Sequence, residues 1–435
     1  MAVQTRHRFD FVDRDLLRQC VHCGLCLPTC PTYRALGVEH DSPRGRIRQM
    51  VRLADLELTP SNDRLRLHTG QCLDCRACET ACPSGVHYGR LIEATRAELY
   101  PKTFGEFLLR KLLLGGAFGS GAALDGLGFA MRAYQKLGVQ AVVRGLGILR
   151  PLPSLGRLEG LMPRAQGGLV RERLPEVTPP VGERRYRVAL LEGCVQAQLF
   201  GDTNAATVRV LAANGCEVVL PSGQGCCGAL HVHSGEKQMA QELARRNIAA
   251  FEASGADYYI VNAAGCGSTL KEYDVLLEDD PAWAERARRF VAKMRDVSEF
   301  LAEAGLTMPL GEVRARATYH DACHLAHGQR ITAQPRELLA RIPGLELVPL
   351  PDSDTCCGSA GIYNLTHYDL AMDILEWKVD AVASTGADMV VAANPGCIIQ
   401  IEHGLAKRGL HVEVIHPIDL LDRSLRATRS RPVLS

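Results

Sequence analysis

Two copies of one cysteine pattern lie near the start of the chain. Each copy is spaced C-x2-C-x2-C-x3-C and is followed by proline: Cys20, Cys23, Cys26 and Cys30 before Pro31, and Cys72, Cys75, Cys78 and Cys82 before Pro83. Three thiolates at this spacing can wrap a loop around an iron-sulfur cube, while the fourth ligates the other cluster. The repeated pattern therefore predicts two neighbouring clusters, an arrangement suited to one-electron transfer.

Two other uses of cysteine fit the pattern less well. Structural zinc takes four ligands in two pairs, so two runs of four thiolates would oversupply it. Disulfides are disfavoured because the chain has seventeen cysteines, an odd number, and because its start, MAVQTRHRFDFVDRD, lacks the apolar core of a signal peptide. We therefore expect a reducing compartment, the cytoplasm.

Length and charge narrow the class of protein. The chain has 435 residues, 46% of them hydrophobic, which is enough for about three packed domains. Its net charge of +1 supplies no basic excess to neutralise phosphates, so we expect no nucleic-acid partner. The longest uncharged stretch of the apolar middle region, Leu112 to Leu124, is too short and glycine-rich for a transmembrane helix.

The middle region, 101–185, separates the paired motifs from the rest of the chain. Its first part has leucine-rich helical periodicity with recurring basic residues, namely Arg110, Lys111, Arg132, Lys136, Arg144 and Arg150. Such helices usually pack on their neighbours, and lying on a membrane surface is the alternative. Six prolines between Pro151 and Arg185 predict an extended linker and a domain boundary there.

The second half of the chain is duplicated. Four cysteines recur in the same order at offsets of 129 to 131 residues, Cys194, Cys226, Cys227 and Cys266 being matched by Cys323, Cys356, Cys357 and Cys397. A glycine follows each cysteine pair. The sequence thus predicts domains at 1–100, 101–185, 186–312 and 313–435, the last two being copies of one cysteine-rich unit.

The coarse structure of each copy places its cysteines together. β-Branched runs at 186–193, 216–221 and 258–263, and again at 317–322, 345–350 and 389–394, lead into the cysteines. Helical segments, such as 203–214, 236–253 and 367–383, separate them. We expect two α/β lobes with parallel sheets, related by a pseudo-twofold axis, each with four thiolates at the carboxyl ends of its strands. Such thiolates suit iron-sulfur or zinc, and whether one, both or neither copy holds a metal stays open.

Other residues near the cysteines have two interpretations. His320, His324 and His327 surround Cys323, and His231 and His233 follow Cys227. Each could ligate or support a metal centre, but a histidine at a strand end more often satisfies a backbone group. Ser42 and Pro43 predict the start of a helix whose arginines, Arg44 and Arg46, moderate the charge of the clusters. Cys216, outside the repeat, is expected to be a small buried hydrophobic residue. The run GGAFGSG at 115–121 lacks the strand and Lys of a phosphate loop, so we expect a helix break.

Taken together, these residues resemble the iron-sulfur subunits of glycolate oxidase (glycolate dehydrogenase). The resemblance runs from about Leu16 to Leu421 and includes CVHCGLCLPTCPTY, SPRGRI, CLDCRACETACPSGV, LEGCVQ, GCCGA and CCGSAGIYNLTH. It implies one [4Fe-4S] cluster on Cys20, Cys23, Cys26 and Cys82, and another on Cys72, Cys75, Cys78 and Cys30. A related subunit of heterodisulfide reductase ends its module in a C-x2-C pair. Here GCGS and PGCII each offer one cysteine, which argues against a five-cysteine cluster.

The resemblance also implies a function. Flavoprotein (FAD) subunits of the same complex would oxidise glycolate to glyoxylate, and this chain would pass the electrons to a quinone or another acceptor. The chain has no flavin or nicotinamide fingerprint, so we predict no residue that is catalytic on substrate. It would lie in the cytoplasm, or peripherally on the inner face of the cell membrane. The alternatives are a glycerol-3-phosphate or lactate dehydrogenase complex and, from another class, a metal-dependent scaffold without electron transfer.

Overall fold

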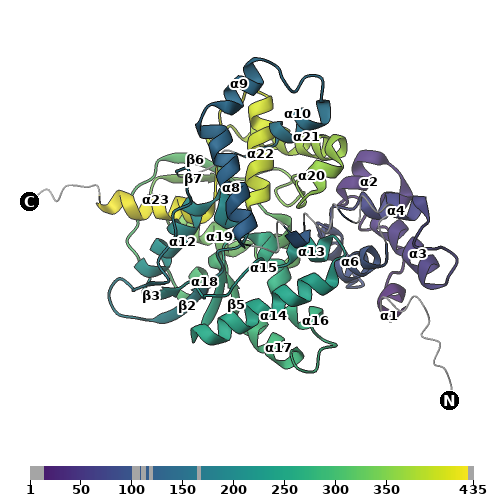
Figure 1. Ribbon diagram of the computed structural model, residues 1–435, viewed down its shortest axis with the longest axis horizontal. Helices are drawn as coiled ribbons and strands as arrows, with labels where there is room; N and C mark the ends of the chain where they lie inside the picture. Colours follow the sequence, from purple (N-terminus) through teal and green to yellow (C-terminus); the bar gives the residue numbers. More distant parts are fainter. Residues whose placement is uncertain (1–13, 100–107, 109–113, 117–120, 164–167, 430–435) are drawn as a thin grey trace, which may run out of the picture.

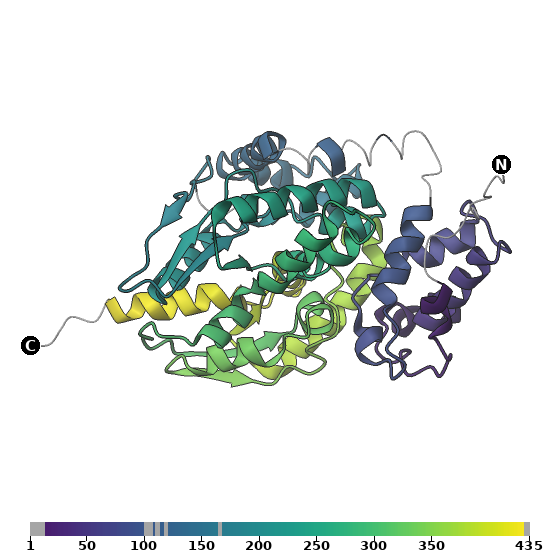
Figure 2. The same ribbon diagram turned by 90° about the horizontal axis from the view of Figure 1, so that it is seen from below.

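The computed structural model describes residues 14–99, 108, 114–116, 121–163 and 168–429. A helical domain lies at one end of the molecule, and two α/β lobes make up most of the rest (Figures 1 and 2). This arrangement confirms the predicted fold class: an all-α domain with the paired cysteine motifs, followed by two copies of a parallel-sheet lobe.

The N-terminal domain is helical throughout its described residues, 14–99. Its elements are α1 (Arg14–Arg18), α2 (Pro31–Leu36), the 3-10 turn η1 (Glu39–Asp41), α3 (Pro43–Ala54), α4 (Asp63–Gly70), α5 (Ala77–Thr80) and α6 (Tyr88–Glu98). Ser42 caps α3 as predicted, since its side chain accepts a hydrogen bond from Gly45 N at 3.0 Å. Pro31 and Pro43 start α2 and α3, where a missing N–H costs nothing.

The first lobe is built on a five-stranded sheet in the order β1-β3-β2-β4-β5. Its strands are β1 (Val177–Thr178), β2 (Tyr186–Leu190), β3 (Cys216–Val219), β4 (Tyr258–Val261) and β5 (Met294–Asp296), all parallel except the edge strand β1. Its helices are α11 (Val195–Leu199), α12 (Gly201–Ala213), α13 (Ala229–His233), α14 (Lys237–Ser254), α15 (Ala264–Leu270), α16 (Tyr273–Leu276), α17 (Ala284–Lys293) and α18 (Val297–Ala304).

The second lobe repeats the parallel part of this sheet in the order β7-β6-β8-β9. Its strands are β6 (Ala315–His320), β7 (Leu345–Val348), β8 (Met389–Ala392) and β9 (Glu413–Ile415). Its other elements are the π-helical turn η3 (His324–Gly328), α19 (Ala333–Ala340), α20 (Tyr363–Thr366), α21 (Tyr368–Thr385), α22 (Pro395–Lys407) and α23 (Pro417–Arg429). All six strands expected from the β-branched runs are present.

The two lobes share a hydrophobic core. Val188 and Ile260 of the first sheet and Val391 of the second belong to one buried cluster. The last helix, α23, crosses onto the first lobe, where Arg209 makes two hydrogen bonds of 2.8 Å with Asp422. Backbone pairing also joins the strand ends, because Ala264 N donates to Ala393 O at 3.1 Å. The lobes therefore form one body, with the carboxyl ends of β4 and β8 meeting at their junction.

The middle region forms three described helices, α8 (Gly121–Lys136), α9 (Val139–Gly145) and α10 (Pro153–Gly160), which lie across both lobes (Figure 1). Arg132 of α8 donates to Gln198 O, and His403 Nδ1 of the second lobe lies 3.0 Å from Gly160 O. The expectation of extended chain from Pro151 is wrong over α10, because the fixed φ of Pro153 suits the first turn of a helix. The expected break in GGAFGSG lies largely outside the described residues. Among the helices that are described, none is both long and apolar enough to cross a membrane.

Candidate metal centre

The two N-terminal cysteine runs fold into similar loops. In the first, His22 and Gly24 have φ of 55° and 86°; in the second, Asp74 and Arg76, at the same places in the motif, have φ of 53° and 61°. Left-handed backbone at these alternate positions curls each loop around its cysteines, and Asp74 N donates to Cys72 Sγ at 3.3 Å. Glycine is needed in the first loop, because a Cβ on Gly24 would meet Arg44 Nη1 at 2.7 Å.

The fourth cysteine of the first run lies with the second run. An apolar cavity beneath α3 is lined by four cysteines, Cys30, Cys72, Cys75 and Cys78. All four are buried. Burial, followed by the charges of the neighbouring cysteines, raises the pKa of Cys78 well above that of a free thiol. We call these four residues the inner group.

Cys82, in turn, lies with the first run. Burial raises the pKa of Cys20, and the charges of Cys82 and Cys23 raise it further. Burial also raises the pKa of Cys26 to about 11, with a contribution from Cys20. Cys20, Cys23, Cys26 and Cys82 thus form an outer group, in which Cys23 is exposed to solvent. The exchange of Cys30 and Cys82 between the runs is the crosswise arrangement that the sequence predicts.

Each lobe brings its four repeated cysteines into a row. In the first lobe Cys194 Sγ and Cys226 Sγ lie 3.5 Å apart, and Cys227 contacts both Cys226 and Cys266. In the second lobe Cys356 contacts Cys323 and Cys357, and Cys357 contacts Cys397. We call these sets the first cup (Cys194, Cys226, Cys227, Cys266) and the second cup (Cys323, Cys356, Cys357, Cys397). Cys216 lies in β3 and is 1% exposed, within the hydrophobic core and outside the first cup, as expected.

The second cup is contiguous with the inner group. Burial, and then the nearby Cys323, raises the pKa of Cys75 well above the ordinary thiol value. Cys75 packs in the same buried cluster as Cys356, Cys357 and Cys397, whereas the cysteines of the first cup belong to a different cluster. Tyr363 bridges the two domains, with its hydroxyl donating to Gln71 O at 3.0 Å. Outer group, inner group and second cup therefore follow one another from the surface inward.

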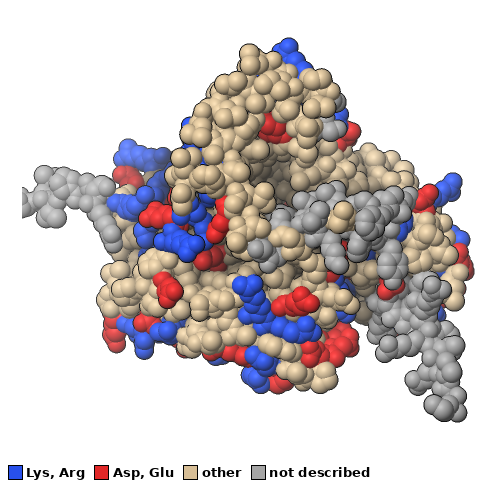
Figure 3. Space-filling view, viewed as in Figure 1, with Lys and Arg blue, Asp and Glu red and all other residues tan. Residues whose placement is uncertain are grey.

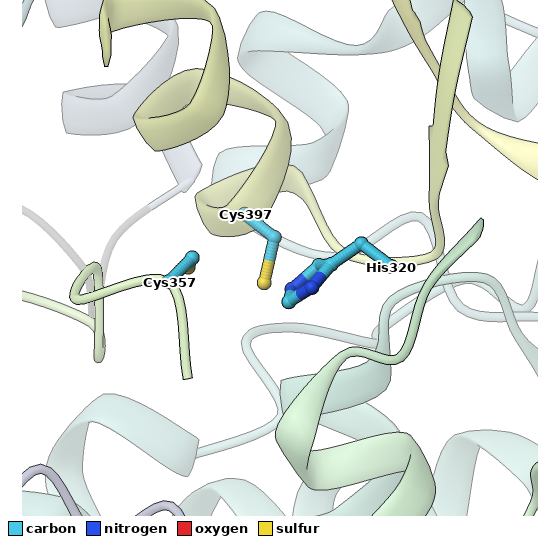
Figure 4. A group of neighbouring side chains, drawn as sticks. All are labelled: His320, Cys357 and Cys397. Atoms are coloured by element: carbon cyan, nitrogen blue, oxygen red, sulfur yellow. The ribbon is translucent and has the colours of Figure 1, made fainter. Parts of the chain in front are cut away.

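The histidines near Cys323 bond backbone carbonyls, the more ordinary of the two interpretations. His324 Nε2 lies 2.9 Å from Asp74 O, His327 Nε2 lies 3.0 Å from Asp354 O, and His320 Nδ1 lies 3.1 Å from Ser353 O. In the first lobe His231 Nε2 lies 2.9 Å from Leu114 O. His320 alone among them also lies close to a cup: one of its ring nitrogens and the Sγ atoms of Cys357 and Cys397 all lie within 4.8 Å of one another (Figure 4). Burial, and then Lys378, lowers the pKa of His320 well below its ordinary value, so its imidazole is neutral.

A buried ionic cluster fastens the helical domain to both lobes. His233 of the first lobe lies 3.0 Å from Glu93 and 3.1 Å from Asp74, and its ring stacks on His324 of the second lobe at 4.9 Å. Burial lowers the pKa of His233, but hydrogen bonds to Asp74 and Glu93 raise it to about 9. Burial, and then His233, lowers the pKa of His324 to about 3. A cationic His233 thus faces two carboxylates, and a neutral His324 stacks on it.

Several residues of the site carry no signal in the sequence. Lys378 is buried in α21, donates to Asp352 O at 2.6 Å and Ser353 O at 3.2 Å, and has the thiols of the second cup as neighbours. Tyr88 donates to Cys72 Sγ at 3.7 Å. Arg46 was expected to offset cluster charge, and it is buried with Cys72 and Cys30 among its neighbours. Only the spacing of Arg46 from the cysteines could have been recognised beforehand.

These donor sets fit soft metals or iron-sulfur clusters. All seventeen cysteines are free, and sixteen of them lie in four groups of four. Crowding four buried thiols is unfavourable unless a cation binds their deprotonated forms. The inner group also surrounds a cavity, and Arg46 places a cation beside it, which suits a centre of net negative charge.

Comparison with known proteins agrees with this division of the chain. A family profile for a 4Fe-4S dicluster domain matches residues 16–86, and one for a cysteine-rich domain matches twice, at 188–271 and 317–402. A third, for the linker region of the glycolate oxidase iron-sulfur subunit, matches residues 105–162. The probable glycolate oxidase iron-sulfur subunit of Bacillus subtilis (strain 168) is 42% identical over 419 residues, covering 94% of each chain. The chain belongs to the glycolate oxidase iron-sulfur subunit family.

Two further relatives show how specific this assignment is. The glycolate oxidase iron-sulfur subunit of Escherichia coli (strain K12) is 35% identical and again 94% of each chain is covered. Lactate utilization protein A of Exiguobacterium sp. (strain ATCC BAA-1283 / AT1b) is 32% identical, but the match covers only 55% of this chain and 98% of that protein. Full-length similarity, including the middle region, thus lies with the glycolate oxidase subunits, and the predicted family is confirmed.

Proposed function

We propose that this chain is the electron-transfer subunit of a glycolate dehydrogenase complex. The observation that carries the proposal is the row of cysteine groups that begins at exposed Cys23, passes through the inner group and continues into the second cup. [4Fe-4S] clusters bound to such groups supply one-electron transfer over short distances. Cys20, Cys23, Cys26 and Cys82 would hold one cluster, and Cys72, Cys75, Cys78 and Cys30 the other.

The protein side chains set the conditions for that transfer. Arg44 donates to His22 O at 3.0 Å beside the outer group, and Arg46 donates to His68 O at 2.6 Å beside the inner group. Their positive charges stabilise the additional negative charge of a reduced centre. The apolar packing around Cys75 and Cys356 keeps water out of the junction between the inner group and the second cup.

The two cups are proposed as additional metal or cluster sites. Each offers four soft sulfur donors at the carboxyl ends of parallel strands, the usual place for ligands in α/β sheets. The second cup adjoins the inner group, so it is positioned to exchange electrons with it. The first cup, in a separate buried cluster, would have a structural or distinct redox role.

The electron balance requires partner subunits. Oxidation of glycolate to glyoxylate releases two electrons and two protons, which a flavin accepts together before releasing electrons one at a time. We therefore propose an FAD-containing partner subunit, with a quinone reduced to the quinol, or another acceptor, at the end of the route. Glycolate is preferred over lactate or glycerol 3-phosphate because the similarity to glycolate oxidase subunits, unlike that to lactate utilization protein A, covers nearly the whole chain.

Anaerobic purification of the complex, with iron and acid-labile sulfide counted per chain, tests the metal assignment. Two cubes give about eight irons, and one or two further clusters raise the count to about twelve or sixteen. Cys30→Ser should remove the paramagnetic signal of the inner group, and Cys82→Ser that of the outer group. Zinc without sulfide would refute the electron-transfer function and favour the scaffold alternative.

We also propose that α8 to α10 contact the lipid surface from which a quinone would be drawn. Ten large apolar side chains are exposed there: Leu127, Phe129, Leu137, Val139, Val142, Leu146, Ile148, Leu152, Leu155 and Leu158. Residues 121–162 carry five basic and two acidic side chains, a charge balance that complements anionic lipids. Figure 3 shows the part of the surface that carries α9 and α10 as a projection with few charges and with Lys or Arg at its tip.

Flotation of the purified chain with vesicles tests this contact. The wild-type chain should bind vesicles containing anionic phospholipid, and Leu146→Asp with Ile148→Asp should abolish binding. Leu67→Asp, an equally exposed position in the helical domain, is the matched control. No vesicle binding, together with loss of the flavoprotein partner in the Leu146/Ile148 variant, would show that this face binds protein instead.

A further inference from the structure

The second cup contains a nitrogen donor that the first cup lacks. His320 is the last residue of β6 and is 0% exposed. Its Nδ1 lies 3.1 Å from Ser353 O, and a carbonyl oxygen can only accept a hydrogen bond, so Nδ1 carries the proton. Nε2 is then the nitrogen with a free lone pair, and among the described residues it has no hydrogen-bond partner.

The free nitrogen belongs to a side chain that faces the cup. A ring nitrogen of His320 and the Sγ atoms of Cys357 and Cys397 lie within 4.8 Å of one another, and all three residues are buried. In Figure 4 the sulfur of Cys397 points toward the imidazole, with Cys357 on the other side of the sulfur. Separations of this size are what ligands around one centre require before the centre draws them together. A hydrogen bond from Nδ1 to a carbonyl is also the usual way in which a metal-binding histidine is oriented.

The duplication supplies an internal comparison. Leu190 pairs with Ile260, six residues before Cys266, and Tyr319 pairs with Val391, six residues before Cys397. Leu190 and Tyr319 are therefore equivalent, and so are the residues that follow them, Leu191 and His320. Leu191 is 1% exposed and offers no donor atom. The same place in the fold is thus apolar in the first lobe and a potential ligand in the second.

A second difference between the lobes points the same way. The helix ends align Gly255, after α14, with Gly386, after α21, so Asn247 and Lys378 are equivalent. Asn247 donates to Cys226 O at 2.9 Å, whereas Lys378 donates to Ser353 O, the carbonyl that also orients His320. The second lobe therefore has both an oriented imidazole and a buried ammonium group where the first has only neutral residues without a ligating nitrogen.

We propose that Nε2 of His320 ligates the metal or cluster in the second cup, beside the thiolates of Cys357 and Cys397, so that this centre is a mixed sulfur-nitrogen site and the first cup is an all-sulfur site. The proposal rests on the proposed metal occupancy of the second cup. Exchanging anionic sulfur donors for neutral imidazole raises the reduction potential of a centre. The second cup would accordingly accept electrons from the inner group rather than donate to it.

Nitrogen-sensitive pulsed paramagnetic resonance on the anaerobically purified holoprotein tests the proposal. The reduced second-cup centre should show hyperfine coupling to one strongly bound nitrogen, and the coupling should change when the protein is labelled with ¹⁵N-histidine. His320→Leu, which installs the residue of the first lobe, should abolish the coupling. His403→Gln, at a histidine bonded to Gly160 O far along α22, should leave it unchanged. For a diamagnetic metal, X-ray absorption should give one nitrogen scatterer that His320→Leu removes.

The outcomes separate this inference from the function on which it rests. A second-cup centre with sulfur ligands alone overturns the role of His320 and leaves the electron-transfer function intact. Unchanged metal and sulfide contents in Cys356→Ser and Cys357→Ser would show that the second cup binds nothing, which overturns both the inference and the proposed occupancy. The labelling experiment needs no substitution, so a variant that fails to fold does not affect the result.

Discussion

Nδ1 of His233 in the first lobe lies 3.1 Å from Oδ2 of Asp74, in the loop between Cys72 and Cys75 of the helical domain. The contact joins residues 159 positions apart and places a positive charge next to the inner cysteine group. Arg76 strengthens the same junction, since it bonds Glu272 of the first lobe at 2.5 and 2.9 Å and Glu93 at 3.0 Å. The position of the inner group relative to the lobes therefore depends on buried ion pairs.

Arg76→Met should loosen this junction. Arg76 is 3% exposed, and removing one partner of a buried ionic network typically costs about 3–5 kcal/mol because the remaining charges lose their compensation. We expect a lower midpoint of anaerobic thermal unfolding and faster proteolysis between the helical domain and the first lobe. Arg288→Ala, which breaks an exposed pair with Glu285, is the control and should behave as wild type. Equal effects of the two substitutions would contradict the role of the junction.

The glycines that follow the two cysteine pairs should differ in their tolerance of alanine. Both have left-handed backbone, with φ of 85° at Gly228 and 88° at Gly358, which costs alanine about 1–2 kcal/mol. A Cβ on Gly358 would also lie 2.5 Å from Ala371 O, whereas the nearest atom to a Cβ on Gly228 is at 3.5 Å. Gly358→Ala should therefore lose more metal from the second cup than Gly228→Ala loses from the first, as measured by metal content per chain. Equal losses would show that backbone strain alone matters.

Asp296 should make the protein less stable as pH rises. Burial raises its pKa to about 6, above the value of about 3.9 in an unfolded chain. The stabilising proton is fully bound below pH 4 and is lost as pH rises through 6, so the contribution of about 1–3 kcal/mol disappears by pH 7.5. Asp296→Asn keeps an acceptor for Ser298 N at the start of α18 without the charge. Its melting temperature should exceed that of wild type at pH 7.5 and approach it at pH 5; parallel pH profiles would refute the assignment.

Lys378 should raise the reduction potential of the second cup. At an effective dielectric constant of about 20, a charge some 6 Å away contributes about 3 kcal/mol. Since 100 mV corresponds to about 2.3 kcal/mol per electron, Lys378→Gln should lower the potential by up to roughly 100 mV. Lys378→Arg, which keeps the charge, should shift it much less. Redox titration of the paramagnetic signals measures both variants, and an unchanged potential in Lys378→Gln would show that the ammonium charge is screened from the centre.

The sequence was sufficient to predict the lobes and the cysteine groups, because both depend on local patterns. β-Branched runs that end at cysteines predict strands whose carboxyl ends meet, and the spacing of Cys20 to Cys30 predicts the exchange of fourth ligands. The short edge strands β1, β5 and β9 were missed, since two or three residues carry no reliable periodicity.

Features that depend on tertiary contacts could not be predicted. His320, His324 and His327 have the same local character, and only the fold shows that His320 alone has an unbonded nitrogen close to two thiols. The pairing of Asp74 with His233 joins distant segments, and nothing in either segment identifies the other. Proline density between 151 and 163 was misleading, because a proline in the first turn of α10 is compatible with a helix.

The most direct test of the account is to add glycolate to the anaerobic complex and follow the iron-sulfur signals of this chain by freeze-quench paramagnetic resonance. The account predicts that the outer and inner cysteine centres become reduced at a rate no slower than turnover. It also predicts that Cys75→Ser abolishes transfer to the acceptor while glycolate still reduces the flavin of the partner subunit. Iron-sulfur centres that stay oxidised while the acceptor is reduced at the normal rate would contradict it.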